Sequence, residues 1–115
     1  MHGTFLRFYV EESQRHQGVQ LWEWLLEQAS ELGIRGGSAF RAIGGFGRQH
    51  ILQESRFFEL AGNVGVEVEF IVSEEEAQRL LAMLESEQIR IFYARIPANF
   101  GVINPDSDDG LDATP

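Results

Sequence analysis

The feature that most constrains the fold is a pattern that occurs twice: a segment with strand periodicity followed by one with helix periodicity. Apolar residues alternate with other residues over positions 4–10 and again over positions 65–72, which predicts two half-buried strands. An apolar stripe over positions 19–32 predicts an amphipathic helix after the first strand, with Gly33 at its C-terminal cap. After the second strand, Ser73 and Glu76 have the spacing of a capping box, which predicts the start of another helix.

Two further strands complete the pattern. Residues 38–43 predict a strand that runs into a glycine-rich segment, and residues 89–96 predict a last strand that ends at Pro97. Residues 54–60 fit either the returning arm of a hairpin or an irregular loop. The order β-α-β-β-α-β predicts an α+β, ferredoxin-like fold, in which the first and third strands are central neighbours in an antiparallel sheet. Both helices then lie on one face of the sheet and leave the other face uncovered.

The periodicity also predicts where single side chains point. Arg7 should share the uncovered face with Glu67 and Glu69, where opposite charges can pair across strands. Phe5, Tyr9 and Ile71 should lie there too, and a face of this composition favours contact with other subunits.

Other side-chain directions are less regular. We expect Trp22 in the apolar stripe of the first helix and Trp24 on its far side, exposed or in a subunit contact. On the second strand, we expect Phe40 to face the core and Arg41 to face the uncovered side, near the base of the glycine-rich segment.

The glycine-rich segment is unusual in charge as well as in composition. Residues 33–52 hold six of the twelve glycines and no acidic side chain, and their three arginines give them a charge of +3 in a chain of net charge −9. A local positive field attracts anions, and glycines can adopt the conformations that expose backbone N–H groups to them. The segment is therefore either a loop that binds a ligand or partner, or simply a mobile hairpin tip.

The overall composition excludes several functions. The net charge of −9 argues against general nucleic-acid binding. The absence of cysteine excludes disulfides and thiolate metal sites, and the absence of lysine excludes a phosphate-binding lysine of the NTPase kind. The N-terminus lacks the pattern of a signal peptide, and no apolar run is long enough to span a membrane, so a cytoplasmic protein without membrane insertion is expected.

The length of 115 residues is that of one domain. We expect the domain to cover residues 1–97, with a long loop at about residues 44–64. Residues 98–115 are acidic and are expected to form a disordered tail.

Several of these residues resemble the PII-like small proteins grouped as domain of unknown function 190, over about residues 3–96. The resemblance is carried by Glu11 after an aromatic strand, by Gly18, Leu21 and Trp22, by Gly33 and Gly36, by Arg41 and Gly44 to Gly47, and by Glu69 and Val72. Ala42 and His50 depart from the family pattern, and residues 85–91 lack the glycine- and lysine-rich phosphate loop of PII proteins proper. The resemblance implies a homotrimer with ligand clefts between subunits and a signalling loop after the second strand.

These observations favour a non-enzymatic regulator without a cofactor that senses a small anion, such as an adenine nucleotide, and signals to a protein target through the loop. The alternative is a structural interaction module that binds no small ligand. His2 and His16 are expected to be surface residues, and the histidine spacing does not predict a metal site. The candidate ligand-binding residues are Arg41, Gly44, Gly45, Phe46, Gly47, Arg48 and His50.

Overall fold

The computed structural model describes residues 1–46, 53–54 and 65–106 of the chain. Its elements in chain order are β1 (His2–Glu11), β2 (Arg15–His16), β3 (Val19–Gln20), α1 (Leu21–Glu31), β4 (Ser38–Arg41), β5 (Gly44–Gly45), β6 (Gln53–Glu54), β7 (Gly65–Val72), α3 (Glu74–Ser86) and β8 (Phe92–Asn99). No helix in this described part is long and apolar enough to cross a membrane.

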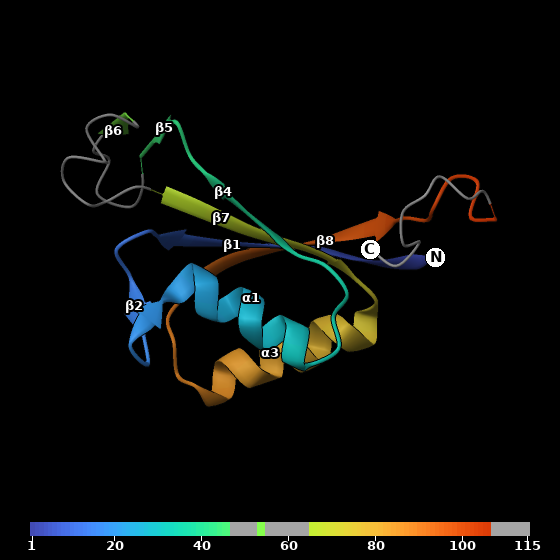
Figure 1. Ribbon diagram of the computed structural model, residues 1–115, viewed down its shortest axis with the longest axis horizontal. Helices are drawn as coiled ribbons and strands as arrows, with labels where there is room; N and C mark the ends of the chain where they lie inside the picture. The colour runs from blue at the N-terminus through green and yellow to red at the C-terminus, as the bar shows by residue number, and fades with distance from the viewer. Residues whose placement is uncertain (47–52, 55–64, 107–115) are drawn as a thin grey trace.

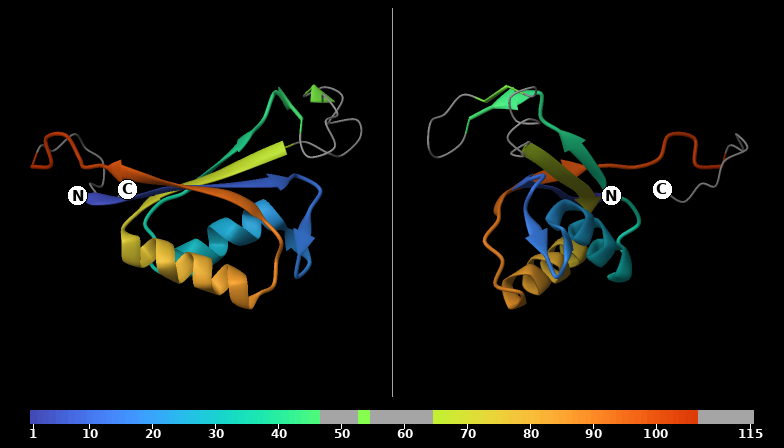
Figure 2. Two further views of the ribbon diagram at one scale, coloured as in Figure 1. Left: turned by 180° about the vertical axis from the view of Figure 1, so that it is seen from behind. Right: turned by 60° about the vertical axis from the view of Figure 1, so that its left-hand side comes forward.

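The main sheet has four strands in the order β4-β7-β1-β8, and each neighbouring pair is antiparallel. The helices α1 and α3 lie on the same side of this sheet, and none of the described residues forms a helix on the opposite face (Figure 1). The view from behind shows the same two layers (Figure 2). The predicted α+β fold is therefore confirmed, as is the prediction that the first and third long strands are central neighbours.

The core lies between the sheet and the two helices. On β1 and β7 every second residue faces it, as the alternating pattern predicts. The buried apolar residues are Leu6, Phe8, Val10, Leu21, Trp24, Leu25, Ala29, Ile34, Val66, Val68, Phe70, Val72, Ala77, Leu80 and Leu84.

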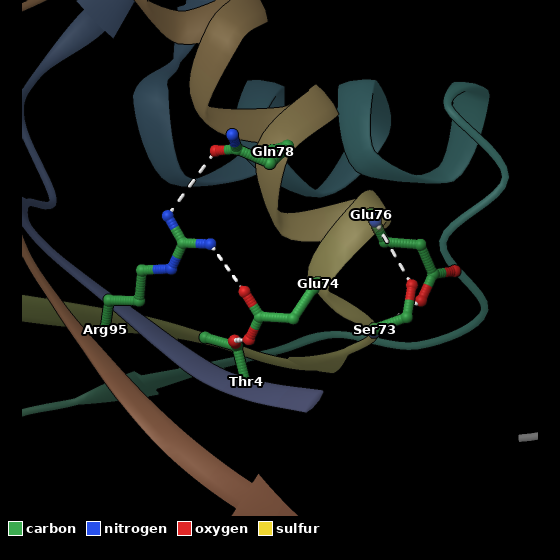
Figure 3. A network of polar contacts seen from close by, with 6 residues as sticks. All are labelled: Thr4, Ser73, Glu74, Glu76, Gln78 and Arg95. Atoms are coloured by element: carbon green, nitrogen blue, oxygen red, sulfur yellow. Dashed lines mark hydrogen bonds and ion pairs between the residues drawn. The ribbon is translucent and has the colours of Figure 1, made fainter. Parts of the chain in front are cut away.

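The helix ends follow the local signals in the sequence. After α1, Gly33 adopts a left-handed φ of 88°, and the N–H of Ile34 donates to the carbonyl of Ala29 at 3.0 Å. Before α3, Ser73 accepts from the N–H of Glu76 at 3.2 Å, and the Glu76 carboxylate accepts from the N–H of Ser73 at 2.8 Å (Figure 3). Both predicted caps are confirmed.

The prediction that Trp24 lies on the far side of the first helix is wrong, because Trp24 is buried in the core. At about 100° per residue, position 24 lies only about 60° from Leu21 around the helix, so it borders the apolar stripe. His16 covers the indole edge-on, with ring centroids 4.5 Å apart. Trp22 lies at the margin of the stripe and is partly buried.

The predicted side-chain directions on the second strand are also reversed. Ala39 and Arg41 pair with buried valines of β7 and therefore lie on the helix side, whereas Phe40 pairs with Glu67 on the uncovered face and is exposed. At Gly37, just before β4, the helix side has no room for a side chain, because a Cβ there would lie 2.4 Å from a ring carbon of Phe70. The start of this edge therefore accepts only small residues on the helix side, and the register turns Phe40 outward although hydrophobicity alone favours burying it.

The last strand continues through Pro97 to Asn99 and does not stop there. Met1 and Phe100 exchange two backbone hydrogen bonds, of 3.0 and 3.1 Å. Hydrogen-bonded and non-hydrogen-bonded pairs alternate along an antiparallel ladder. The pair of Thr4 and Pro97 is the third after that of Met1 and Phe100, so it is a non-hydrogen-bonded pair. The proline nitrogen thus points away from β1, to the free edge of the sheet, and no ladder bond is lost.

Two short hairpins complete the fold. The predicted connection over residues 11–18 contains β2, which pairs with β3 around Gln17 and Gly18, and both turn residues have positive φ as such a hairpin needs. The glycine-rich segment contains β5, which pairs with β6. Of residues 54–60, expected as a hairpin arm or an irregular loop, Glu54 ends β6 and residues 55–60 lie outside the described residues.

Candidate functional site

The predicted ligand-binding residues fall at one end of the sheet. Arg41 ends β4, and Gly44, Gly45 and Phe46 follow it. Gly47, Arg48 and His50 lie outside the described residues. The described part of the site therefore consists of Arg41, the start of the glycine-rich segment and the side chains of neighbouring strands that end at the same place.

The topology brings the end of β1 to this place. Because β1 and β4 are both antiparallel to β7, they run in the same direction and end at the same end of the sheet, as Figure 1 shows. Glu12 follows the last residue of β1, and its side chain meets that of Arg41.

Arg41 and Glu12 form a bidentate ion pair. The Arg41 Nε donates to Glu12 Oε2 at 2.7 Å, and Arg41 Nη2 donates to Glu12 Oε1 at 2.6 Å. Two parallel hydrogen bonds of this kind match the planar guanidinium fork to the planar carboxylate. The Arg41 side chain remains 56% exposed and that of Glu12 26% exposed, so solvent reaches the pair mainly from the arginine side.

This geometry corrects the expectation for Arg41. Its guanidinium was expected on the uncovered face, where it would grip an anion or pin a neighbouring subunit's Glu67 or Glu69. It lies on the helix side and binds a carboxylate of its own chain. Sequence reasoning missed Glu12 because the predicted topology brings the ends of the first two strands together but does not show which side chain there meets Arg41.

The glycines after Arg41 have extended conformations in the described part of the segment. Gly44 and Gly45 form β5, and neither adopts the positive φ that would build a backbone nest for an anion. The apolar side chains around them are exposed: Ile43 by 87% and Phe46 by 67%. The segment thus presents an apolar surface beside the Arg41–Glu12 pair.

The uncovered face contains a second cluster of charges, and its prediction is confirmed. Arg7 Nε donates to Glu69 Oε2 at 2.9 Å and lies 3.9 Å from Glu67 Oε2, and its guanidinium carbon lies 5.2 Å from the centre of the Phe5 ring. A hydrogen bond with Tyr9 and the negative charges of both glutamates raise the pKa of Arg7, so it stays charged. Apolar side chains surround this cluster: Tyr9, Phe40, Ile71, Phe92 and Ile96.

A third polar cluster joins α3 to the sheet (Figure 3). The buried hydroxyl of Thr4 donates to one oxygen of Glu74, and Arg95 Nη2 donates to the other oxygen at 2.7 Å. These bonds favour the charged carboxylate, so they lower the pKa of Glu74, the Thr4 bond more than the Arg95 bond. The cluster fixes the first turn of α3 over β1 and β8.

The histidines do not form a metal site in the described part of the chain. No group of three or more His, Cys, Asp or Glu residues lies there in a position to hold a metal ion. His16 is half-buried against Trp24, and its Nε2 lies 2.9 Å from Glu87 Oε1, so it is less of a surface residue than expected. His2 is exposed.

Two solved structures share the fold of this chain. A protein of Thermus thermophilus, described as a PII-like signalling protein, has a TM-score of 0.57 and 22% sequence identity, with 85% of this chain and 87% of that chain covered. The protein CPII from Thiomonas intermedia K12, solved with ADP and bicarbonate bound, has a TM-score of 0.54 and 19% identity, with 85% and 89% covered. At these identities the comparison establishes the fold.

The sequence comparisons establish the family. A "UPF0166 protein" of Aquifex aeolicus (strain VF5) is 33% identical over 82 residues, which are 71% of this chain and 78% of that protein. The model of the DUF190 family, described as "Uncharacterized ACR", matches residues 3–90. The match spans β1 to α3, and with them the Arg41–Glu12 pair and the glycine-rich segment, so the chain belongs to the DUF190 family.

Proposed function

We propose that this protein is a non-enzymatic, PII-like regulator that binds a small anionic ligand at the end of the sheet where Arg41 meets the glycine-rich segment. The observation that carries the proposal is the bidentate grip of Arg41 on a carboxylate at the base of that segment. A guanidinium that holds one carboxylate in this geometry has the orientation to hold another carboxylate or a phosphate.

The ligand class follows from the same chemistry. ADP and bicarbonate, which are bound in the Thiomonas protein of the same fold, are both oxyanions. An adenine nucleotide is the first candidate here and bicarbonate the second. The positive charge of Arg41 lies in a chain of net charge −9, so anion binding depends on local contacts and not on the overall field.

The test is isothermal titration with ADP, ATP, AMP and bicarbonate against the Arg41→Ala variant. Losing a charge-assisted bidentate contact should weaken binding of the best ligand by about ten- to a hundredfold. The matched control is Arg35→Ala, which removes the same charge from an exposed position six residues earlier. Equal affinities of the two variants would place the ligand elsewhere, and no binding by the wild-type protein at millimolar concentration would end the proposal.

We also propose that the regulator is a homotrimer assembled through the uncovered face of the sheet. Support comes from the five exposed apolar side chains that surround the Arg7 cluster, because burying such a surface favours association. Light scattering at micromolar concentration should report three subunits, and Ile71→Asp should dissociate them. Ile103→Asp, at an exposed position outside the sheet, is the control. A wild-type monomer would contradict the trimer.

The second candidate function is an interaction module, in which the glycine-rich segment docks on a protein and no small ligand takes part. The exposure of Ile43 and Phe46 favours it, since exposed apolar side chains on both sides of β5 offer contacts to a partner. The double variant Ile43→Ser/Phe46→Ser should then lose a protein partner that the wild-type protein captures. The interaction module is the better interpretation if none of the ligands above binds and the double variant fails to capture the partner.

A further inference from the structure

The Arg41–Glu12 pair has the geometry of an anion site that is already filled. Glu12 occupies both hydrogen-bonding positions of the guanidinium edge, through Nε and Nη2, with bonds of 2.7 and 2.6 Å. An oxyanion that binds to the same edge needs the same two donors. It can form both of these bonds only after the Glu12 carboxylate has moved away.

We propose that Glu12 is an internal competitor that regulates anion binding at Arg41 and selects the anions that can bind there. This inference rests on the proposed function, since it concerns the same site. A ligand that replaces both hydrogen bonds must carry two oxygen atoms on one central atom, as phosphates, carboxylates and bicarbonate do. A spherical anion such as chloride replaces the charge of Glu12 but not the pair of directed bonds.

The backbone around the pair is held in place, so competition involves the Glu12 side chain. The carbonyl of Glu12 accepts from Gln20 Nε2 at 3.0 Å, and the N–H of Gln14 donates to the carbonyl of Glu11 at 3.0 Å. On the other strand, the N–H of Ala42 donates to the carbonyl of Gly65 at 2.8 Å and fixes the end of β4. Displacement of Glu12 is then a rotation of its side chain, without rearrangement of either strand.

The exposure of the pair sets the size of the effect. The Arg41 side chain is 56% exposed, so water screens its attraction to Glu12 and the contact is weak enough for a ligand to break. The interaction free energies of exposed ion pairs correspond to a loss of about two- to fivefold in the affinity of a competing anion. Removal of the Glu12 charge should therefore tighten anion binding, although it removes a contact of the folded protein.

The experiment compares Glu12→Gln with Glu11→Gln in titrations with ADP and with inorganic phosphate, with ionic strength held constant by sodium chloride. Glutamine keeps the size of glutamate but is uncharged. Glu11 is exposed and adjacent, so Glu11→Gln removes the same charge at a position where the side chain does not bind Arg41. We expect Glu12→Gln to bind about two- to fivefold more tightly than the wild-type protein and Glu11→Gln to bind as the wild-type protein does. The gain should disappear in the double variant Glu12→Gln/Arg41→Ala.

Each other outcome has a definite meaning. A gain larger than fivefold for Glu12→Gln, with the wild-type protein still binding measurably, supports a stronger competitor. Equal affinities of Glu12→Gln and Glu11→Gln overturn the competitor and leave the proposed ligand site intact. Weaker binding by Glu12→Gln also overturns it, because Glu12 then positions Arg41 for the ligand. No binding by any variant overturns both the competitor and the proposed function.

Discussion

The two faces of the four-stranded sheet are built from the same strands by the same alternation, yet they hold very different side chains. On the helix side, β1 and β7 contribute only apolar side chains and Thr4 to a closed core. On the uncovered side, the same strands contribute Arg7, Glu67 and Glu69 at the centre, with exposed aromatic and aliphatic groups around them. The alternation assigns a residue to a face, but what covers that face decides whether the residue stabilises the monomer.

The largest expected effect comes from truncating the same residue type on opposite faces. Phe8 on the helix side is 1% exposed, and Phe92 on the uncovered side is 74% exposed. Phe8→Ala should lower the free energy of unfolding by about 3–5 kcal/mol, because it leaves a cavity in the core. Phe92→Ala should change it by less than about 0.5 kcal/mol in a monomer.

Urea unfolding monitored by circular dichroism measures both values. Repeating the Phe92→Ala measurement over a range of protein concentrations tests whether the uncovered face is buried in an oligomer. A loss that grows with protein concentration would show that the uncovered face is buried between subunits. Losses of equal size for both variants at every concentration would contradict the distinction between the faces.

A single methyl group tests the same comparison at the edge strand. A Cβ at Gly37 would lie 2.4 and 2.7 Å from two ring carbons of Phe70, whereas a Cβ at Gly36 would meet nothing within 4 Å. Gly37→Ala should therefore lower the free energy of unfolding by about 1–3 kcal/mol through overpacking. Gly36→Ala should be neutral or slightly stabilising, because alanine has fewer unfolded conformations to lose. A tolerated Gly37→Ala would mean that the Phe70 ring can move away from this position.

The smallest expected effect concerns the polar contact at the border of the core and appears as a pH dependence. The Thr4 hydrogen bond and Arg95 lower the pKa of Glu74 from its ordinary value of 4.5. A depressed pKa stabilises the fold above the unfolded-state pKa, and this contribution is lost as the pH falls through the folded-state value.

Thr4→Val keeps the shape of the side chain and removes the donor. Its free energy of unfolding should therefore fall less steeply than that of the wild-type protein as the pH falls below about 4.5, and Arg95→Ala should show a smaller change of the same sign. Urea unfolding at a series of pH values measures the slopes. Parallel curves for Thr4→Val and the wild-type protein would contradict a stabilising role of the Glu74 charge.

The sequence predicts the fold well where local patterns and tertiary packing agree. The strands β1 and β7 alternate cleanly because one face of each is buried along its whole length, and the caps at Gly33 and Ser73 depend on a few adjacent residues. The resemblance to the DUF190 family, expected over about residues 3–96, is confirmed by the family match over residues 3–90.

The wrong predictions concern side chains whose direction depends on residues that are distant in the sequence and close in space. The hydrophobic pattern favours an inward Phe40, but the register with β7 places Phe40 opposite Glu67 on the uncovered face, and the Phe70 ring closes the helix side at Gly37, just before β4. The side of α1 that bears Trp24 is covered by a hairpin that the sequence reads as a connection. In the candidate site, Arg41 was predicted from its own segment, whereas Glu12 becomes its partner only through the parallel ends of β1 and β4. The predictions for Gly47, Arg48 and His50 remain predictions.

The position of Pro97 bears on how copies of the protein can assemble. Its nitrogen points to the free edge of β8, where a further strand would need an N–H donor and finds none. A sheet that ended in an unbroken row of donors and acceptors would invite the next copy to extend it, and the next again, into a fibre. Pro97 interrupts that row, so growth of the sheet by adding strands at β8 is disfavoured. Copies can still meet through the face of the sheet, where an assembly can close on itself.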